Sequence, residues 1–190
     1  QVGPQSAGAE PGPASYGRGG SQPTVTDANV ELGRIDPMHF AGGTMVLDAE
    51  AASAALKSGL ASLGDPLSAA FGIAEIVDEN MANAAREHAV ERGKSLAGRT
   101  LIAFGGSAPI HAARLAEKLG IARIVVPLAA GVGSAIGFLR APVAFQVART
   151  NYQRLGSLDA AALNAMFAAM SSESRAVVAR GAPGARPAEA

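Results

Sequence analysis

Two adjacent glycines, Gly105 and Gly106, are the residues of this chain best suited to contact a ligand through the backbone. They follow a short apolar run, 101–104 (LIAF), that is typical of a buried strand, and they precede Pro109 and a helical spacing of apolar residues over 109–119. Glycine lets a ligand approach the backbone closely, and the first N–H groups of a helix attract an anion. The turn therefore favours ligand binding, although tight turns also use glycine for geometric reasons alone.

The turn lacks two common phosphate-binding patterns. No Gly-Lys-Ser/Thr follows it, which excludes a Walker A loop, and the G-x-G-x-x-G spacing of a dinucleotide site is absent. A Gly-Gly pair between a strand and a helix instead resembles the adenosine-binding turns of the actin, Hsp70 and sugar-kinase superfamily, in which the backbone lies flat against the nucleotide.

Histidine is the next residue type that could take part in chemistry. His111 falls in the first turn of the predicted helix, where a neutral imidazole could contact a ligand or transfer a proton. The alternative is a partly buried side chain that is satisfied by the local backbone. His39, His88 and His111 have no metal-ligand spacing, so the sequence predicts no metal site.

Carboxylates occur together on the predicted helix 67–92. Asp78 and Glu79 could serve metal or base chemistry, and the neighbouring Asn80 could contact a ligand. Carboxylates beside Arg86 are, however, typical of a solvated face with pairs four residues apart.

Asp27 and Asn29 lie in a different setting. They follow residues 1–24, a segment with six glycines and four prolines that predicts a loop able to close over a ligand. Helix capping is the alternative role for both side chains.

Composition limits the classes of function. The 190 residues are 48% hydrophobic and only 4% aromatic, and 16 basic residues balance 16 acidic ones, so no overall field favours nucleic acid or an anionic membrane. The absence of cysteine excludes a disulfide scaffold and a thiolate nucleophile. The most apolar stretch, 121–148, is broken by charges, prolines and glycines, which predicts a soluble, cytoplasmic protein without a membrane span. Because Gln1 is not a start methionine, we expect a fragment of a longer protein.

The elements that position these residues follow from the apolar spacing. Helix 109–119 lies between the strands 101–104 and 123–127, which predicts a βαβ unit and an α/β fold. Further expected elements are helices at 48–63, 67–92, 131–140 and 158–180, a strand at 144–150 and a linker at 181–190. The expected buried face of helix 67–92 contains Leu67, Phe71, Ile73, Ile76, Val77, Met81, Ala84, Ala85 and His88.

Three segments carry a family resemblance. Residues 2–36 (VGPQSAGAEPGPASYGRGGSQPTVTDANVELGRID), 78–93 (DENMANAAREHAVERG) and 103–121 (AFGGSAPIHAARLAEKLGI) are similar, in this order and spacing, to the hydantoinase A / 5-oxoprolinase family. The resemblance implies an actin-like ATPase fold in which ATP phosphorylates the carbonyl oxygen of a cyclic amide, with Mg²⁺ as the second cofactor. Residues 1–143 would be the later part of that ATPase domain, and 144–190 the start of a C-terminal region.

The resemblance also assigns residues. It implies that Gly105, Gly106 and Ser107 bind the nucleotide, with Pro109 and His111 behind them. It places Asp27 and Asn29 near the cleft, to which Asn80 adds a further candidate contact, and it leaves the catalytic residue unknown, with Asp27 and His111 as candidates. The family often has cysteine where this chain has Ser15, so no thiol chemistry is expected in that loop.

The sequence is consistent with three functions. The first is the A-type subunit of an ATP-dependent hydrolase of a hydantoin, 5-oxoproline or a lactam, which works with a hydantoinase B-like partner. The second is a subunit of an ATP-dependent carboxylase of acetone or acetophenone. The third is a non-catalytic α/β assembly module. Because the family's phosphate-binding motifs are absent from these residues, the fragment alone is expected to be inactive.

Overall fold

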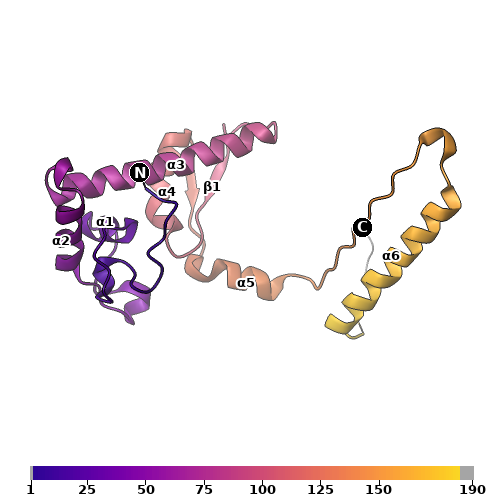
Figure 1. Cartoon of the computed structure of the whole chain (residues 1–190), viewed down its shortest axis with the longest axis horizontal. Helices are drawn as coiled ribbons and strands as arrows, with labels where there is room; N and C mark the ends of the chain where they lie inside the picture. Colours follow the sequence, from indigo (N-terminus) through magenta and orange to yellow (C-terminus); the bar gives the residue numbers. More distant parts are fainter. Residues whose placement is uncertain (1, 185–190) are drawn as a thin grey trace. The chain divides into compact units, whose positions relative to one another are not determined.

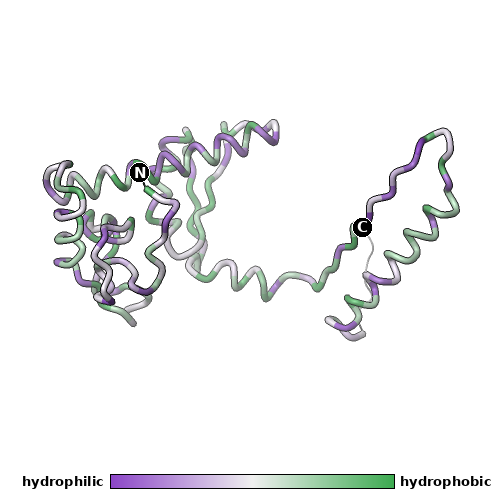
Figure 2. Tube along the Cα trace, in the orientation of Figure 1, coloured by the Kyte–Doolittle hydropathy of each residue, from purple (hydrophilic) through white to green (hydrophobic). Residues whose placement is uncertain are grey.

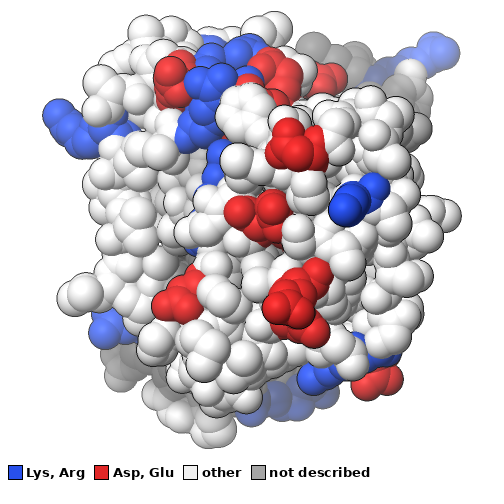
Figure 3. Space-filling model, turned by 90° about the vertical axis from the view of Figure 1, so that its left-hand side faces the viewer, with Lys and Arg blue, Asp and Glu red and all other residues white. Residues whose placement is uncertain are grey.

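The computed structural model describes residues 2–184, which form two compact units that divide between Ser134 and Ala135 (Figure 1). The linker expected at 181–190 lies mostly outside the described residues. None of the described helices is long and apolar enough to cross a membrane. On the face shown in Figure 3, acidic and basic side chains are interspersed among uncharged ones.

The first unit combines helices with a short parallel sheet, so the predicted α/β class is confirmed. Strand β1 (Thr100–Ile102) pairs with β2 (Arg123–Val125), with Leu101 opposite Ile124, and helix α4 (Ala108–Leu119) connects them. The βαβ unit is therefore present as predicted. The other elements of this unit are η1 (Ala14–Tyr16), α1 (Val25–Glu31), η2 (Phe40–Gly43), α2 (Ala49–Gly59), η3 (Ala61–Leu63), α3 (Pro66–Glu91) and η4 (Ala130–Val132), and α5 (Gly133–Arg140) begins at its end.

Aspartates start the long helices of the first unit. Asp48 accepts a hydrogen bond from the backbone N–H of Ala51 at the start of α2, and Asp65 accepts one from Ser68 at the start of α3. Such N-caps satisfy N–H groups that have no partner within the helix. They explain why both helices begin where the sequence predicted.

The buried face of α3 differs from the prediction. Ile73 is buried as expected, but Leu67, Phe71 and Ile76 are 54%, 55% and 44% exposed. The buried face of α3, which packs on α1, α2 and α4, is instead rich in alanine. Its buried residues are Ala69, Ala70, Ile73, Ala74, Asp78, Ala82 and Ala89. Small side chains let helix backbones approach closely, whereas apolar periodicity alone selected the bulky side chains.

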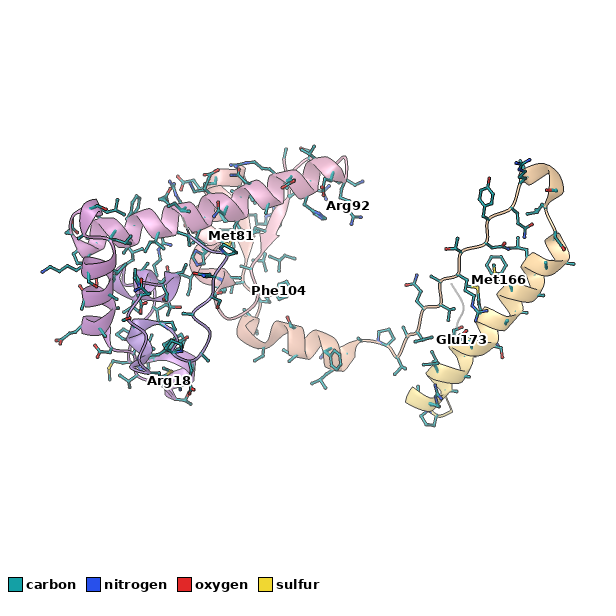
Figure 4. All side chains as sticks on the ribbon, in the orientation of Figure 1. Arg18, Met81, Arg92, Phe104, Met166 and Glu173 are labelled. Atoms are coloured by element: carbon teal, nitrogen blue, oxygen red, sulfur yellow. The ribbon has the colours of Figure 1, made fainter. Side chains whose placement is uncertain are left out.

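The predicted burial of strand 101–104 is also wrong for most of its residues. Ala103 is 4% exposed, but Ile102 and Phe104 are 60% and 51% exposed. The strands and α5 are largely hydrophobic in Figure 2. Helix α4 packs on β2, and Phe104, labelled in Figure 4, lies beside Gly133 at the start of α5, where an added Cβ would meet its ring. A sheet of two strands cannot bury both of its faces with these elements alone.

The second unit contains the predicted C-terminal helix but not the predicted strand. Helix α6 (Ala160–Gly181) begins at Asp159, which accepts a hydrogen bond from the N–H of Ala162. Residues 144–150 form no strand, although Arg149 makes an ion pair of 2.6 Å with Glu173 of α6 (Figure 4). A strand needs a partner for its backbone groups, and no described residue of this unit provides one.

One buried carboxylate anchors the glycine-rich loop to α1. Asp27, with no exposed surface, accepts hydrogen bonds from the N–H groups of Ala14 at 3.2 Å, Ser15 at 2.8 Å and Thr24 at 2.9 Å. It also accepts one from the Thr24 hydroxyl, which completes a capping box at the start of α1. The capping role expected for Asp27 is therefore present, and the same side chain ties down the loop.

Replacing Asp27 with alanine should release this loop. Buried N–H groups that lose their acceptor are costly, so we expect faster trypsin cleavage after the exposed Arg18, together with a lower thermal midpoint. The control Asp48→Ala removes one exposed cap of α2 and should leave the cleavage rate after Arg18 unchanged. Equal cleavage rates in the two variants would contradict the anchoring role.

Candidate functional site

The turn after β1 leaves its backbone open. Gly105 has a φ of +108°, which favours glycine, and its N–H donates to the carbonyl of Ala130 at 2.7 Å. Gly106 has no such constraint, and a Cβ added to it would meet no atom within 4 Å. Packing within this chain therefore does not explain why residue 106 lacks a side chain.

Helix α4 begins directly at this turn. Ser107 occupies the N-cap position, but its exposed side chain makes no capping hydrogen bond, in contrast to the aspartates that start α2 and α3. Pro109, half-buried in the first turn, has no N–H to donate. The turn thus combines an accessible backbone with an uncapped helix start.

His111 is joined to a carboxylate of α3. Its Nδ1 lies 2.7 Å from Oδ1 of Asp78, and the two residues are 6% and 0% exposed. The solvated face expected for Asp78 is therefore wrong. The local backbone contact expected for His111 is also replaced, because its partner lies 33 residues earlier in the chain.

Arg34 approaches the same carboxylate from a third segment. Its Nη1 lies 3.6 Å from Oδ2 of Asp78, and this oxygen has no hydrogen-bond partner among the described residues. Arg34 follows α1, where its own N–H donates to the carbonyl of Asn29. Sequence reasoning missed Arg34, because a single arginine after a glycine carries no pattern that points to a distant carboxylate.

Ion pairs between α3 and α4 fix the position of His111. Glu75 contacts Arg114 at 2.7 Å and Lys118 at 3.0 Å, and Glu79 contacts Lys118 at 2.9 Å and Arg86 at 3.0 Å. Hydrogen bonds from Arg114 and then Lys118 lower the pKa of Glu75 to about 2. Most of these contacts cross between the helices, whereas the sequence predicted pairs within one helix.

The other predicted site residues are dispersed. Asp27 is buried with both oxygens occupied, and Asn29 is 3% exposed with its Oδ1 unpartnered among the described residues. Ser15, where the resembled family often has cysteine, is fully buried, and its Oγ has no hydrogen-bond partner within residues 2–184. Asn80 is exposed on α3 and has no side-chain hydrogen bond within the described part of the chain.

Two further features bear on the site. Residues 2–184 contain no group of three or more His, Cys, Asp or Glu that could hold a metal ion. A pocket of about 370 Å³ lies at the end of α3, near Arg92 in Figure 4, and contains none of the predicted site residues. Its lining residues are Ala85, His88, Ala89, Arg92, Lys94, Ser95, Leu96 and Arg99.

Known proteins are similar to this chain in sequence and in fold. The profile of the hydantoinase/oxoprolinase family matches residues 1–147. The alpha subunit of a caprolactamase from Pseudomonas jessenii is 40% identical over 157 residues, which cover 82% of this chain and 23% of that subunit. The gamma subunit of acetophenone carboxylase from Aromatoleum aromaticum is 45% identical over 139 residues, 72% of this chain and 19% of that subunit.

A solved structure extends the likeness to the fold. Nucleotide-free acetone carboxylase, from work on ATP-dependent acetone carboxylation, matches with a TM-score of 0.72 and 27% identity over 92% of this chain. The match covers 26% of that chain. This chain therefore spans about a fifth to a quarter of the length of these relatives.

The ion pairs of Glu75 predict a specific pH dependence. Because its pKa is lowered from 4.5 to about 2 in the folded state, ionised Glu75 stabilises the fold above pH 4.5, and this contribution is lost as the pH falls toward 2. The thermal midpoint of Glu75→Gln should therefore fall less steeply between pH 5 and pH 2 than that of the parent chain. Glu87→Gln, at an exposed position without an ion pair among the described residues, is the control. Parallel curves for Glu75→Gln and the parent chain would contradict this role.

Proposed function

We propose a function for this chain on the basis that it belongs to the hydantoinase/oxoprolinase family. The chain is part of the ATP-dependent A-type subunit of an enzyme that hydrolyses a cyclic amide, such as a hydantoin, 5-oxoproline or a lactam. ATP would supply a phosphoryl group that activates the amide carbonyl oxygen. Residues 1–143 would form the later part of an actin-like ATPase domain, and residues 144–190 the start of the region that follows it.

The open backbone at Gly106 is the observation that supports nucleotide binding. A flat adenosine could lie against Gly105 and Gly106 without meeting a side chain, since a Cβ on either residue would meet no atom within 4 Å. Ser107 keeps a free hydroxyl beside this surface, and the uncapped start of α4 suits a negatively charged ligand. These residues therefore fit the ligand that the relatives' ATP dependence suggests.

His111 is the better placed of the two catalytic candidates. All the hydrogen bonds that Asp27 makes go to the glycine-rich loop and to Thr24, and its carboxylate has no exposed surface. We therefore assign Asp27 to organising the loop, with the buried Asn29 beside it on α1. His111 and Pro109 share the first turn of α4 with the nucleotide surface, whereas the exposed Asn80 is a weaker candidate for ligand contact.

The remaining parts of the proposal concern cofactor and partner. Mg²⁺ would accompany ATP, because divalent cations neutralise the charge that develops in phosphoryl transfer. The relatives are subunits by name, which supports a second subunit of the hydantoinase B type. The cytoplasm, where ATP is available, would be the compartment.

A second function has a specific observation in its favour. The acetophenone carboxylase subunit is 45% identical over its matched region, and acetone carboxylase has a similar fold. The same nucleotide surface could then serve phosphorylation of an enol oxygen before carboxylation. The third interpretation, a non-catalytic assembly module, has no comparable support in these relatives.

ATP hydrolysis separates these functions. The full-length protein with its partner subunit should hydrolyse ATP faster when hydantoin, 5-oxoproline or a lactam is added, because substrate completes the phosphoryl-acceptor site. The 190-residue chain alone is the negative control and should show no turnover. Stimulation only by acetophenone or acetone with bicarbonate would replace the hydrolase proposal with the carboxylase one. ATP hydrolysis that no substrate raises would contradict both.

A further inference from the structure

The two oxygens of Asp78 face two different partners, and these contacts determine which nitrogen of His111 carries a proton. Oδ1 contacts Nδ1 of His111 at 2.7 Å, and Oδ2 faces Nη1 of Arg34 at 3.6 Å. An ionised carboxylate only accepts hydrogen bonds, so the proton between Asp78 and His111 resides on Nδ1. In a neutral imidazole, the opposite nitrogen, Nε2, is then an acceptor.

His111 lies within the first turn of the helix that starts at the glycine turn. His111 follows Ser107 by four residues, so the two lie on the same face of α4. Helical side chains tilt toward the N-terminus of their helix, which carries His111 toward Ser107 and Gly106. In the described part of the chain, four side-chain atoms are fully buried and lack a hydrogen-bond partner, and Nε2 of His111 is not one of them.

We propose that Asp78 is a positioning residue that holds His111 in the Nδ1-protonated form, so that Nε2 accepts a hydrogen bond from an N–H or O–H group of the ligand at the glycine turn. The identity of that ligand rests on the proposed function, whereas the proton position rests on the buried contacts alone. An ATP amine or ribose hydroxyl has the required chemistry, and so does the N–H of a cyclic amide.

Arg34 would determine the orientation of an asparagine amide at position 78. A guanidinium has donors and no acceptor, so in Asp78→Asn it would attract the amide oxygen. The amide NH₂ group would then face Nδ1 of His111 and force the proton onto Nε2. An asparagine in place of a histidine-orienting aspartate is known to favour the wrong tautomer while the geometry stays intact.

Removing the arginine should reverse that effect. In Arg34→Met/Asp78→Asn no guanidinium claims the amide oxygen, so the amide can rotate and accept from Nδ1 again. Arg34 is partly exposed, with 26% of its side-chain surface accessible, and methionine keeps much of its aliphatic length. A purely structural ion pair would not be rescued in this way, because the double variant has lost both charges.

The test uses the full-length protein with ¹⁵N-labelled histidine and its partner subunit. The His111 resonances are assigned by their loss in His111→Gln. We expect a proton on Nδ1 in the parent protein, on Nε2 in Asp78→Asn, and on Nδ1 again in the double variant. A proton on Nε2 in the parent protein, or an unchanged tautomer in folded Asp78→Asn, would overturn the proposal.

Turnover provides a second readout. Asp78→Asn should lower the substrate-stimulated kcat by about tenfold to a hundredfold, as expected for loss of one hydrogen bond to a bound group, and the double variant should recover part of it. His111→Asn covers the case in which Asp78→Asn does not fold, because its amide still donates to Asp78 but offers no group in place of Nε2. Parent-like turnover in folded His111→Asn would also overturn the proposal. If the parent protein shows no ATP-dependent turnover, the proposed function fails, and the tautomer measurement alone decides this inference.

Discussion

A fully buried carboxylate is unfavourable unless charged or hydrogen-bonding groups surround it, and Asp78 meets this condition by joining three segments. It lies in the middle of α3, contacts His111 of α4 and faces Arg34 after α1. Because α4 starts at the glycine turn, this contact and the ion pairs of Glu75 and Glu79 also set the position of the turn. The position of the glycine turn thus depends on a carboxylate that lies inside the protein.

Asp27, a residue of α1, is a second buried carboxylate that hydrogen bonds surround. Its carboxylate gathers N–H groups from a loop that has little apolar surface of its own. Alanine-rich packing of α1 against α3 brings the helix that carries Asp27 next to the helix that carries Asp78. Two buried acids therefore organise segments that hydrophobic burial alone would leave loosely specified.

Local rules predicted the βαβ unit, helices that begin near residues 48 and 158, and the glycine turn, because each depends on neighbouring residues. The burial of Asp78 could not be predicted, because its partners lie far away in the sequence and a charged residue followed by Glu79 and Asn80 is typical of a solvated face. The prediction of the buried face of α3 was wrong because small residues, not large ones, pack against α1. The strand predicted at 144–150 does not form, because alternation of apolar and polar residues indicates a strand only where the edge of another strand is available for pairing.

We propose that the backbone at Gly106 faces a nucleotide, and ATP binding by full-length Gly106→Val tests this proposal. Gly72→Val in α3 is a matched control, because an added Cβ meets no atom within 4 Å at either position and neither glycine needs a positive φ. Our account predicts that Gly106→Val stays folded and binds ATP at least about tenfold more weakly, because the new side chain occupies the ligand's space. The control should bind ATP as the parent does. Unchanged affinity in Gly106→Val would show that no nucleotide lies against this turn.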